Sequence, residues 1–243
     1  MKEKTDFLII GSGIAGLKFA LKAATAGNVI IVTKKAVADS NTNRAQGGIA
    51  AVFDGLDSFD AHINDTLAAG DGLCHEPVVS HVVKNGPASI LELADAGIDF
   101  NRAAQGASAF DLGREGGHSH NRIVHAHDLT GKEIEQALVS LVRANPRIKV
   151  YEDHIAIDLI THSTRVKRGP IVQLQEVYCC GAYVLDKKND FVKTFHAKIT
   201  LLATGGAGKV YAYTSNPDIA TGDGIAMAYR AGATVANLEF VQF

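Results

Sequence analysis

The sequence predicts an α/β fold with a parallel sheet at its centre, and three observations support this prediction. A glycine-rich turn, Gly11–Gly16, directly follows the apolar run Asp6–Ile10. The segment after the turn, Leu17–Ala26, is rich in alanine and leucine, which favours a helix. A second apolar run, Val29–Val32, then completes a strand–helix–strand unit. Continuous apolar strands of this kind are typical of a parallel sheet that is covered on both faces.

The remaining elements are expected from composition and hydrophobic periodicity. Further helices are predicted over Ser58–Ala69, Glu76–Ala96, Gly131–Val142 and Gly222–Ala231. Further strands are predicted over Ile148–Glu152, Ile155–Ile160, Gln175–Asp186, Phe191–His196 and Lys198–Ala203. The apolar face of the helix predicted over Glu76–Ala96 is expected to comprise Val78, Val82, Ile90, Leu91, Leu93 and Ala94. No linker is visible, so we expect one domain over residues 1–243, with an inserted β-meander at about 148–197.

Composition excludes several classes of protein. The chain has 243 residues, of which 47% are hydrophobic and 21% charged, as in ordinary globular proteins. A formal net charge of −2 gives no reason to expect nucleic acid as a partner. No apolar run reaches the roughly 18 residues of a membrane span. Only three cysteines are present, which argues against a disulfide framework and favours a reducing compartment such as the cytoplasm.

The turn Gly11-Ser12-Gly13-Ile14-Ala15-Gly16 matches the G-x-G-x-x-G fingerprint of a Rossmann-like dinucleotide-binding fold. In this motif the first glycine permits the turn, the second lets the backbone approach a pyrophosphate, and the third lets the helix pack on the strand. The helix N-terminus offers unpaired N–H groups to the phosphates. The alternative is a purely structural turn, but the position between a strand and a helix favours binding.

The second strand ends in Thr33 and Lys34, where many dinucleotide-binding proteins have an acidic residue for the adenosine ribose. The missing carboxylate argues against an ordinary NAD-dependent dehydrogenase. The Thr33 hydroxyl and the Lys34 charge remain able to hold a dinucleotide.

Five further segments, in order along the chain, resemble the succinate dehydrogenase/fumarate reductase flavoprotein family. They are Ser40–Ala51, Arg114–His120, Leu202–Gly206, Asn216–Gly224 and Asn237–Phe243. The resemblance spans essentially the whole chain and implies an FAD-binding domain. The family's capping and C-terminal helical domains, its substrate-binding histidine and its proton-transferring arginine are expected beyond Phe243.

The resemblance also implies roles for individual residues. Family members that bind FAD covalently have a histidine at the position of Asn41, so this chain is expected to bind FAD non-covalently. Asp223 is expected to contact the ribitol, although a helix cap is a serious alternative. The implied cofactor-binding residues are Gly11, Ser12, Gly13, Ile14, Ala15, Gly16, Thr33, Lys34, Asn41, Thr42, Asn43, Arg44, Ala45, Gln46, Gly47, Gly48, Ala203, Thr204, Gly205 and Asp223.

Within the family, Glu115 makes the chain resemble the L-aspartate oxidases, because succinate dehydrogenases and fumarate reductases typically have glutamine there. A carboxylate is the natural partner of the substrate's ammonium group. The resemblance implies oxidation of L-aspartate to iminoaspartate, with O₂ or fumarate as acceptor, in NAD biosynthesis, and transfer of the product to quinolinate synthase. The alternatives are a fumarate reductase or succinate dehydrogenase subunit and a non-catalytic FAD-binding module.

The histidines near Glu115 do not have the spacing of a metal site. His118 or Arg122 is expected to line the substrate pocket, and the resemblance adds Gln242 as a catalytic candidate. His125 and His127 are expected to be surface groups or to support the site indirectly. His62 and His154, among others, are expected to be solvated or locally bonded.

Overall fold

The computed structural model describes residues 2–104, 110–126, 129–162 and 178–242. These residues form two compact units, one comprising residues 1–43 and 138–243, and the other comprising residues 44–137. We describe each unit separately. In the described part of the chain, no helix is long and apolar enough to cross a membrane.

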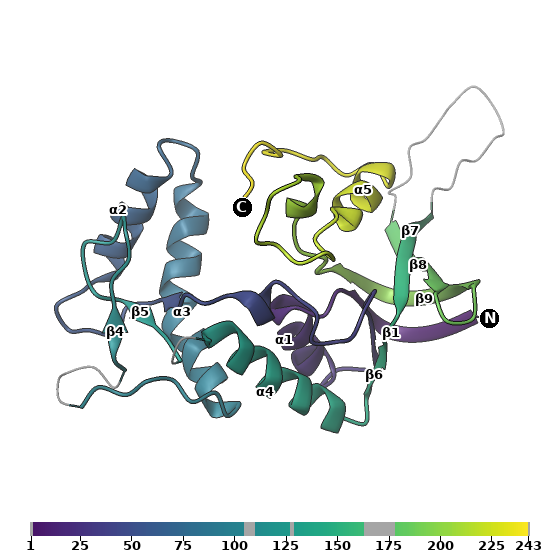
Figure 1. Ribbon diagram of the computed structural model, residues 1–243, viewed down its shortest axis with the longest axis horizontal. Coiled ribbons are helices and arrows are strands. Elements are labelled where there is room, and N and C mark those ends of the chain that lie inside the picture. The colour runs from purple at the N-terminus through teal and green to yellow at the C-terminus, as the bar shows by residue number, and fades with distance from the viewer. Residues whose placement is uncertain (1, 105–109, 127–128, 163–177, 243) are drawn as a thin grey trace. The chain divides into compact units, whose positions relative to one another are not determined.

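The first unit is built on a six-stranded sheet in the order β6-β2-β1-β9-β8-β7. The strands are β1 (Lys2–Ile10), β2 (Val29–Val32), β6 (Ile148–Tyr151), β7 (His154–His162), β8 (Tyr178–Asp186) and β9 (Phe191–Leu202). The pairs β6–β2, β2–β1 and β1–β9 are parallel, whereas β9–β8 and β8–β7 are antiparallel. The predicted α/β fold with a parallel sheet is therefore confirmed, and the ribbon shows the sheet edge-on beside α1 (Figure 1).

Helices cover the two faces of this sheet. A side chain on Gly16 of α1 (Ile14–Ala23) would contact the Ile9 side chain, so α1 lies on the face that carries Ile9. Because neighbouring residues of a strand point to opposite faces, Leu8 and Ile10 lie on the other face. There they form a core with Met227 of α5 (Asp223–Arg230). Coverage of both faces explains why Leu8–Ile10 are almost completely buried.

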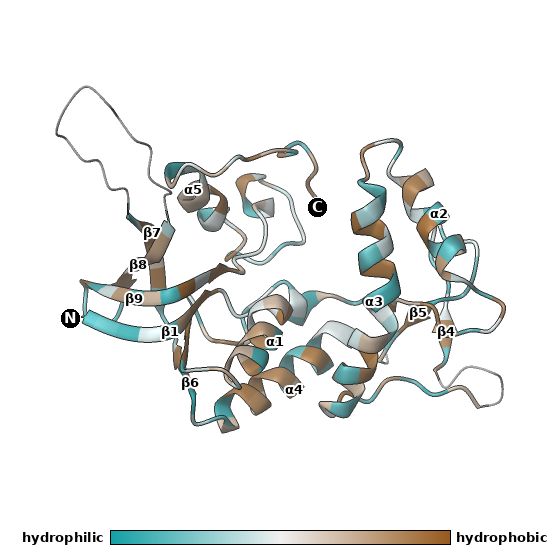
Figure 2. Ribbon diagram, turned by 180° about the vertical axis from the view of Figure 1, so that it is seen from behind, coloured by the Kyte–Doolittle hydropathy of each residue, from teal (hydrophilic) through white to brown (hydrophobic). Residues whose placement is uncertain are grey.

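Strand β9 differs from the prediction. Two strands, Phe191–His196 and Lys198–Ala203, were expected, but a single twelve-residue strand is found. Residues 191–196 of β9 pair with β8, as predicted, and residues 194–202 pair with β1. The same pairing extends β1 back to Lys2, through hydrophilic residues that precede its apolar end (Figure 2). The expected strand residues 175–177 lie outside the described part of the chain.

The second unit contains two helices and a small three-stranded sheet in the order β3-β5-β4. The helices are α2 (Phe59–Ala69) and α3 (Glu76–Asp95), and the strands are β3 (Ile49–Ala50), β4 (Leu112–Gly113) and β5 (Ile123–Val124). The helix α4 (Thr130–Ala144) runs from the second unit into the first. Short 3₁₀ helices cover Thr42–Arg44 and Gly208–Val210.

The predicted apolar face of α3 is partly wrong. Ile90 and Leu93 are buried as expected, but Val78, Val82 and Leu91 are exposed, by 60%, 63% and 49%. Val83 is buried in their place. The buried face of α3 includes Gly86. A side chain added there would contact Ala51, so this side of the helix lies close to the neighbouring backbone.

Candidate functional site

The glycine-rich turn lies between the carboxyl ends of β2 and β9. The Gly11 N–H donates to the Val32 carbonyl at 2.9 Å, and the Ala203 N–H donates to the Ile10 carbonyl at 2.8 Å. Gly11 has a positive φ of 110°, and a side chain there would clash with the Ala203 carbonyl. A side chain on Gly16 would clash with the Gly11 carbonyl. These two glycines are therefore required by the fold of the turn itself.

Gly13 is different, because the fold alone does not require a glycine there. Its φ of −72° is open to any residue, and an added Cβ would lie 3.3 Å from the Thr42 hydroxyl oxygen. Gly13 is the N-cap of α1 and, as a glycine, has no side chain with which to cap the helix. The Ile14 N–H donates to the Thr42 hydroxyl at 3.1 Å. The following N–H groups and the positive end of the helix dipole form an anion site of the kind that binds phosphates.

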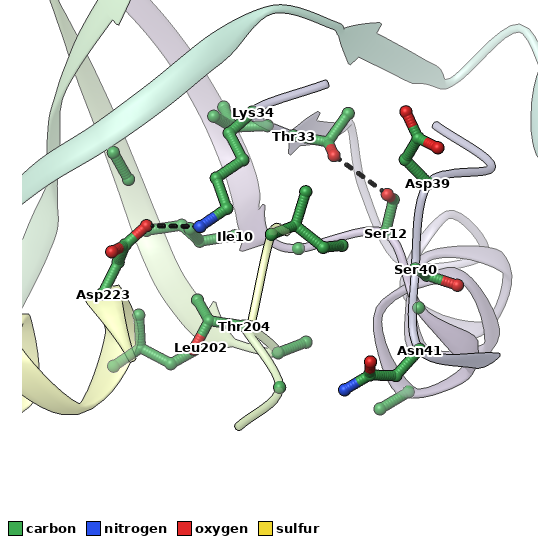
Figure 3. Close-up of a pocket in the computed structure, with 18 of the residues that line it drawn as sticks. Ile10, Ser12, Thr33, Lys34, Asp39, Ser40, Asn41, Leu202, Thr204 and Asp223 are labelled. Atoms are coloured by element: carbon green, nitrogen blue, oxygen red, sulfur yellow. Dashed lines mark hydrogen bonds and ion pairs between the residues drawn. The ribbon is translucent and has the colours of Figure 1, made fainter. Parts of the chain in front are cut away.

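Beyond β2, a lysine and an aspartate meet across the pocket (Figure 3). Lys34 Nζ lies 2.7 Å from the Asp223 carboxylate and 2.5 Å from the Thr221 hydroxyl. Burial opposes ionisation of Asp223, but the hydrogen bonds from Lys34 and Thr221 outweigh it and lower the pKa of the carboxyl. The N-cap of α5 is Gly222, and Asp223 makes no capping bond there. Within the described residues, the hydrogen bonds of the Asp223 side chain come from Lys34 and Thr221, and its contact with the ribitol stays a prediction.

Thr33 contributes differently from the expectation. Its side chain is buried, and the Ser12 hydroxyl donates to the Thr33 hydroxyl oxygen at 3.0 Å (Figure 3). The pair joins the turn to the end of β2, so Thr33 shapes the pocket as well as lining it.

The pocket in the first unit has a volume of about 330 Å³. The predicted cofactor residues that line it are Gly11, Ser12, Gly13, Ile14, Ala15, Thr33, Lys34, Asn41, Thr42, Ala203, Thr204, Gly205 and Asp223. Gly16 does not line the pocket, in agreement with its packing role. Residues from β7 also line the pocket, and sequence reasoning did not single them out for it: His154, Ile155 and Ala156.

His154 is the clearest of these missed residues. Its backbone N–H donates to the Thr33 carbonyl at 3.0 Å, which brings β7 to the end of β2. Its Nδ1 donates to the Glu152 carbonyl at 2.6 Å, so Nε2 is the acceptor for Lys193 Nζ at 3.0 Å. Lys193 in turn pairs with the buried Asp186 at 2.7 Å. Local bonding of His154 was expected, but no sequence spacing indicates this buried cluster.

The later part of the predicted flavin loop belongs to the second unit. A side chain on Gly48 would clash with the Val124 carbonyl, so Gly48 permits close packing on β5. An added Cβ on Gly47 would lie 3.5 Å from Glu115 Oε1. The loop glycine and the predicted substrate residue are thus neighbours. They line a second pocket together with Gln46, Gly48, Gly113, Arg114, Ile123 and His125.

Other predicted residues have simpler surroundings. The Asn43 N–H donates to the Ser40 hydroxyl at 3.2 Å, and the Ala45 carbonyl accepts from the Gly131 N–H at 3.0 Å. Arg44 lies in the 3₁₀ helix that begins at Thr42. The Gln242 carbonyl accepts a hydrogen bond from the Asn216 side chain at 2.8 Å, and Gln242 lines neither of the two pockets.

The expectation for Arg122 is wrong. Its side chain is completely buried and is paired with Asp57 and Asp65, so it does not line a pocket. His118 is half-buried and lies beside Arg122. His127 lies outside the described residues.

The parallel sheet, the glycine turn and the uncapped helix N-terminus together define a dinucleotide-binding domain. Its residues fit FAD, because Gly13 has no side chain to keep a pyrophosphate from the helix N-terminus, and Lys34 and Asp223 line the same pocket. The chain belongs to the FAD binding domain family, whose model matches residues 6–243.

Individual known proteins are similar to this chain in sequence and in fold. The chain is 52% identical, over 98% of its length, to L-aspartate oxidase 1 from Ralstonia nicotianae, and 48% identical to the chloroplastic L-aspartate oxidase of Arabidopsis thaliana. It covers 43% and 35% of those proteins, respectively. Among solved structures, quinol fumarate reductase from E. coli matches 95% of this chain at 30% identity and a TM-score of 0.85, with 37% of that chain covered. The chain thus spans less than half the length of these relatives.

Proposed function

We propose that the full-length protein is an FAD-dependent oxidase of L-aspartate, which it converts to iminoaspartate. The observation that carries the proposal is the proximity of Glu115 to the flavin-loop glycine Gly47: a Cβ added at Gly47 would lie 3.5 Å from Glu115 Oε1, and both residues line the second pocket. The carboxylate lies where the loop that we assign to the flavin ring meets the loop that we assign to the substrate. The L-aspartate oxidases at 45–52% identity support this assignment.

Aspartate differs from succinate by one α-ammonium group, and Glu115 supplies the charge that this group needs. FAD, when bound, would supply a hydride acceptor for the oxidation, with O₂ or fumarate as the final acceptor. We propose that His118 contacts a substrate carboxylate and that Gln242 is a further catalytic residue. We also propose that Asn43, Arg44, Ala45, Gln46, Gly47 and Gly48 contact the flavin.

Fumarate reduction is the second candidate, because solved structures with a similar fold include fumarate reductases. Glu115 distinguishes the two activities, because its carboxylate pairs with the ammonium group of aspartate and fumarate has no such group. A charge-assisted hydrogen bond of this type contributes about 1.5–3 kcal/mol, which is roughly ten- to a hundredfold in rate.

The test compares Glu115→Gln with wild-type protein, both full-length and loaded with FAD. We expect kcat/KM for aspartate to fall ten- to a hundredfold, while fumarate reduction by reduced enzyme is unchanged or faster. Glu133→Gln, on the exposed start of α4, is the matched control. If both activities fell equally, Glu115 would not recognise the ammonium group.

We further propose that this reaction is the first step of de novo NAD biosynthesis and that quinolinate synthase receives the product. The compartment that we propose is the cytoplasm. The three free cysteines Cys74, Cys179 and Cys180 are consistent with a reducing compartment.

A further inference from the structure

Arg122 is completely buried, yet its charge is permanent, so its partners must compensate for lost hydration. Nε and Nη2 donate to the two oxygens of Asp57 at 2.9 and 2.8 Å, in a bidentate pair. Nη1 donates to Asp65 Oδ2 at 2.7 Å. The Asp57 side chain is also fully buried. This arrangement fixes the guanidinium plane and the direction of each of its N–H groups.

The same carboxylates hold the loop that carries Glu115. Asp65, on α2, accepts hydrogen bonds from the backbone N–H and the hydroxyl of Ser119, both at 2.8 Å. The Ser119 N–H, above all, lowers the pKa of Asp65 to about 2, with further contributions from the Ser119 hydroxyl and Arg122. Asp65 is therefore ionised at neutral pH, and it ties α2 to the loop.

Two N–H directions of Arg122 are left: Nη2 donates to the Ser119 hydroxyl at 3.4 Å, and Nη1 faces a histidine. Nη1 lies 3.3 Å from His118 Nδ1. A guanidinium group only donates, so Nδ1 is the acceptor and the hydrogen of the neutral ring is on Nε2. The neighbouring ring of His62 lies 5.7 Å away, and burial together with the charge of Arg122 lowers the pKa of His62. Arg122 thus determines which nitrogen of His118 offers a hydrogen-bond donor.

We propose that Arg122 is a positioning residue for the substrate site, which holds His118 as an Nε2–H donor for a carboxylate of a dicarboxylic acid. Arg122 itself is enclosed and does not touch the substrate. Glu115 and His118 then recognise opposite charges of one molecule, the ammonium and a carboxylate. The inference rests on the proposed function, because it requires a dicarboxylate in the pocket.

A double-mutant cycle in the full-length flavoprotein tests the inference. Fumarate binding to the oxidised enzyme is followed by the absorbance of the bound flavin, so no turnover is needed. We expect Arg122→Lys and His118→Ala each to raise the Kd for fumarate about tenfold, as for one lost charge-assisted hydrogen bond. The double variant is expected to bind no more weakly than His118→Ala, because Arg122 acts through His118.

Two further variants separate positioning from folding. Arg102→Lys makes the same replacement on an exposed arginine of the same unit and is expected to leave the Kd unchanged. If Arg122→Lys fails to retain FAD, Asp65→Asn replaces it in the cycle, because this change leaves Arg122 paired with Asp57. Losses that multiply in the double variant would overturn the inference and make Arg122 merely structural. If the wild-type enzyme bound no fumarate, the proposed function would be overturned as well. This result differs from multiplied losses in the double variant, which would overturn only the role of Arg122.

Discussion

Gly13→Val separates cofactor binding from folding at the glycine turn. The backbone at Gly13 has a φ of −72°, which valine adopts without strain. Among the described residues, the nearest neighbours of the added Cβ are the Thr42 hydroxyl oxygen at 3.3 Å, which has to move by a few tenths of an ångström, and the Ser40 Cβ at 3.9 Å, an ordinary contact. The stability of the protein should therefore change by no more than about 1 kcal/mol.

FAD binding should respond much more strongly to the same change. The valine side chain occupies the space through which a pyrophosphate approaches the N–H groups of α1. Loss of one hydrogen bond to a charged phosphate costs about 1.5–3 kcal/mol, so the Kd for FAD should rise ten- to a hundredfold or more. The assay removes FAD from the full-length protein and follows rebinding by quenching of flavin fluorescence.

Gly16→Ala is the matched control for this experiment. Its Cβ would clash with the Gly11 carbonyl, so it should lower the thermal midpoint of the apoprotein as well as flavin binding. Gly13→Val should lower flavin binding alone. An unchanged Kd for FAD in Gly13→Val would refute the assignment of Gly13 to the pyrophosphate.

Three other predictions concern the cofactor link and two charged clusters. Acid precipitation should release all flavin into the supernatant, because the Asn41 amide is not a nucleophile; yellow colour in the denatured pellet would contradict this. Lys193→Met should lower the urea midpoint clearly, because it leaves the Asp186 carboxylate buried without its cation, whereas Lys187→Met on the surface should be nearly neutral. Equal midpoints for the two variants would argue against a buried pair. Asp65 has a folded pKa of about 2 against its ordinary 3.8, so its stabilising contribution is present above pH 4 and is lost as the pH falls towards 2. The difference in thermal midpoint between wild type and Asp65→Asn should shrink over that pH window, and a constant difference would count against the ionised carboxylate.

Local features could be predicted where contacts with nearby backbone atoms decide the role of a residue. The roles of Gly11, Gly13 and Gly16 follow from their spacing, because each acts through contacts of the turn between one strand and the next helix. The helix start at Ser58 was similarly local, since the Ser58 hydroxyl accepts from the Ala61 N–H at 3.0 Å.

Strand continuity and helix orientation were less predictable. The break expected within β9 does not exist, because pairing with β1 holds the chain extended after β8 ends. The buried face of α3 was set by close approach to Ala51, which hydrophobic periodicity alone does not reveal.

The sequence by itself determined the dinucleotide turn and the order of the main elements, since each depends on residues close together in the chain; the roles of the flavin loop and of Glu115 stay predictions. Only the tertiary structure decided three pairings. Lys34 meets Asp223 across 189 positions, His154 meets Lys193 across 39, and Arg122 meets Asp57 across 65. The physical reason is that an ion pair or a hydrogen bond needs proximity in space. The order of the strands and the packing of the loops bring these side chains together, whereas spacing along the chain does not.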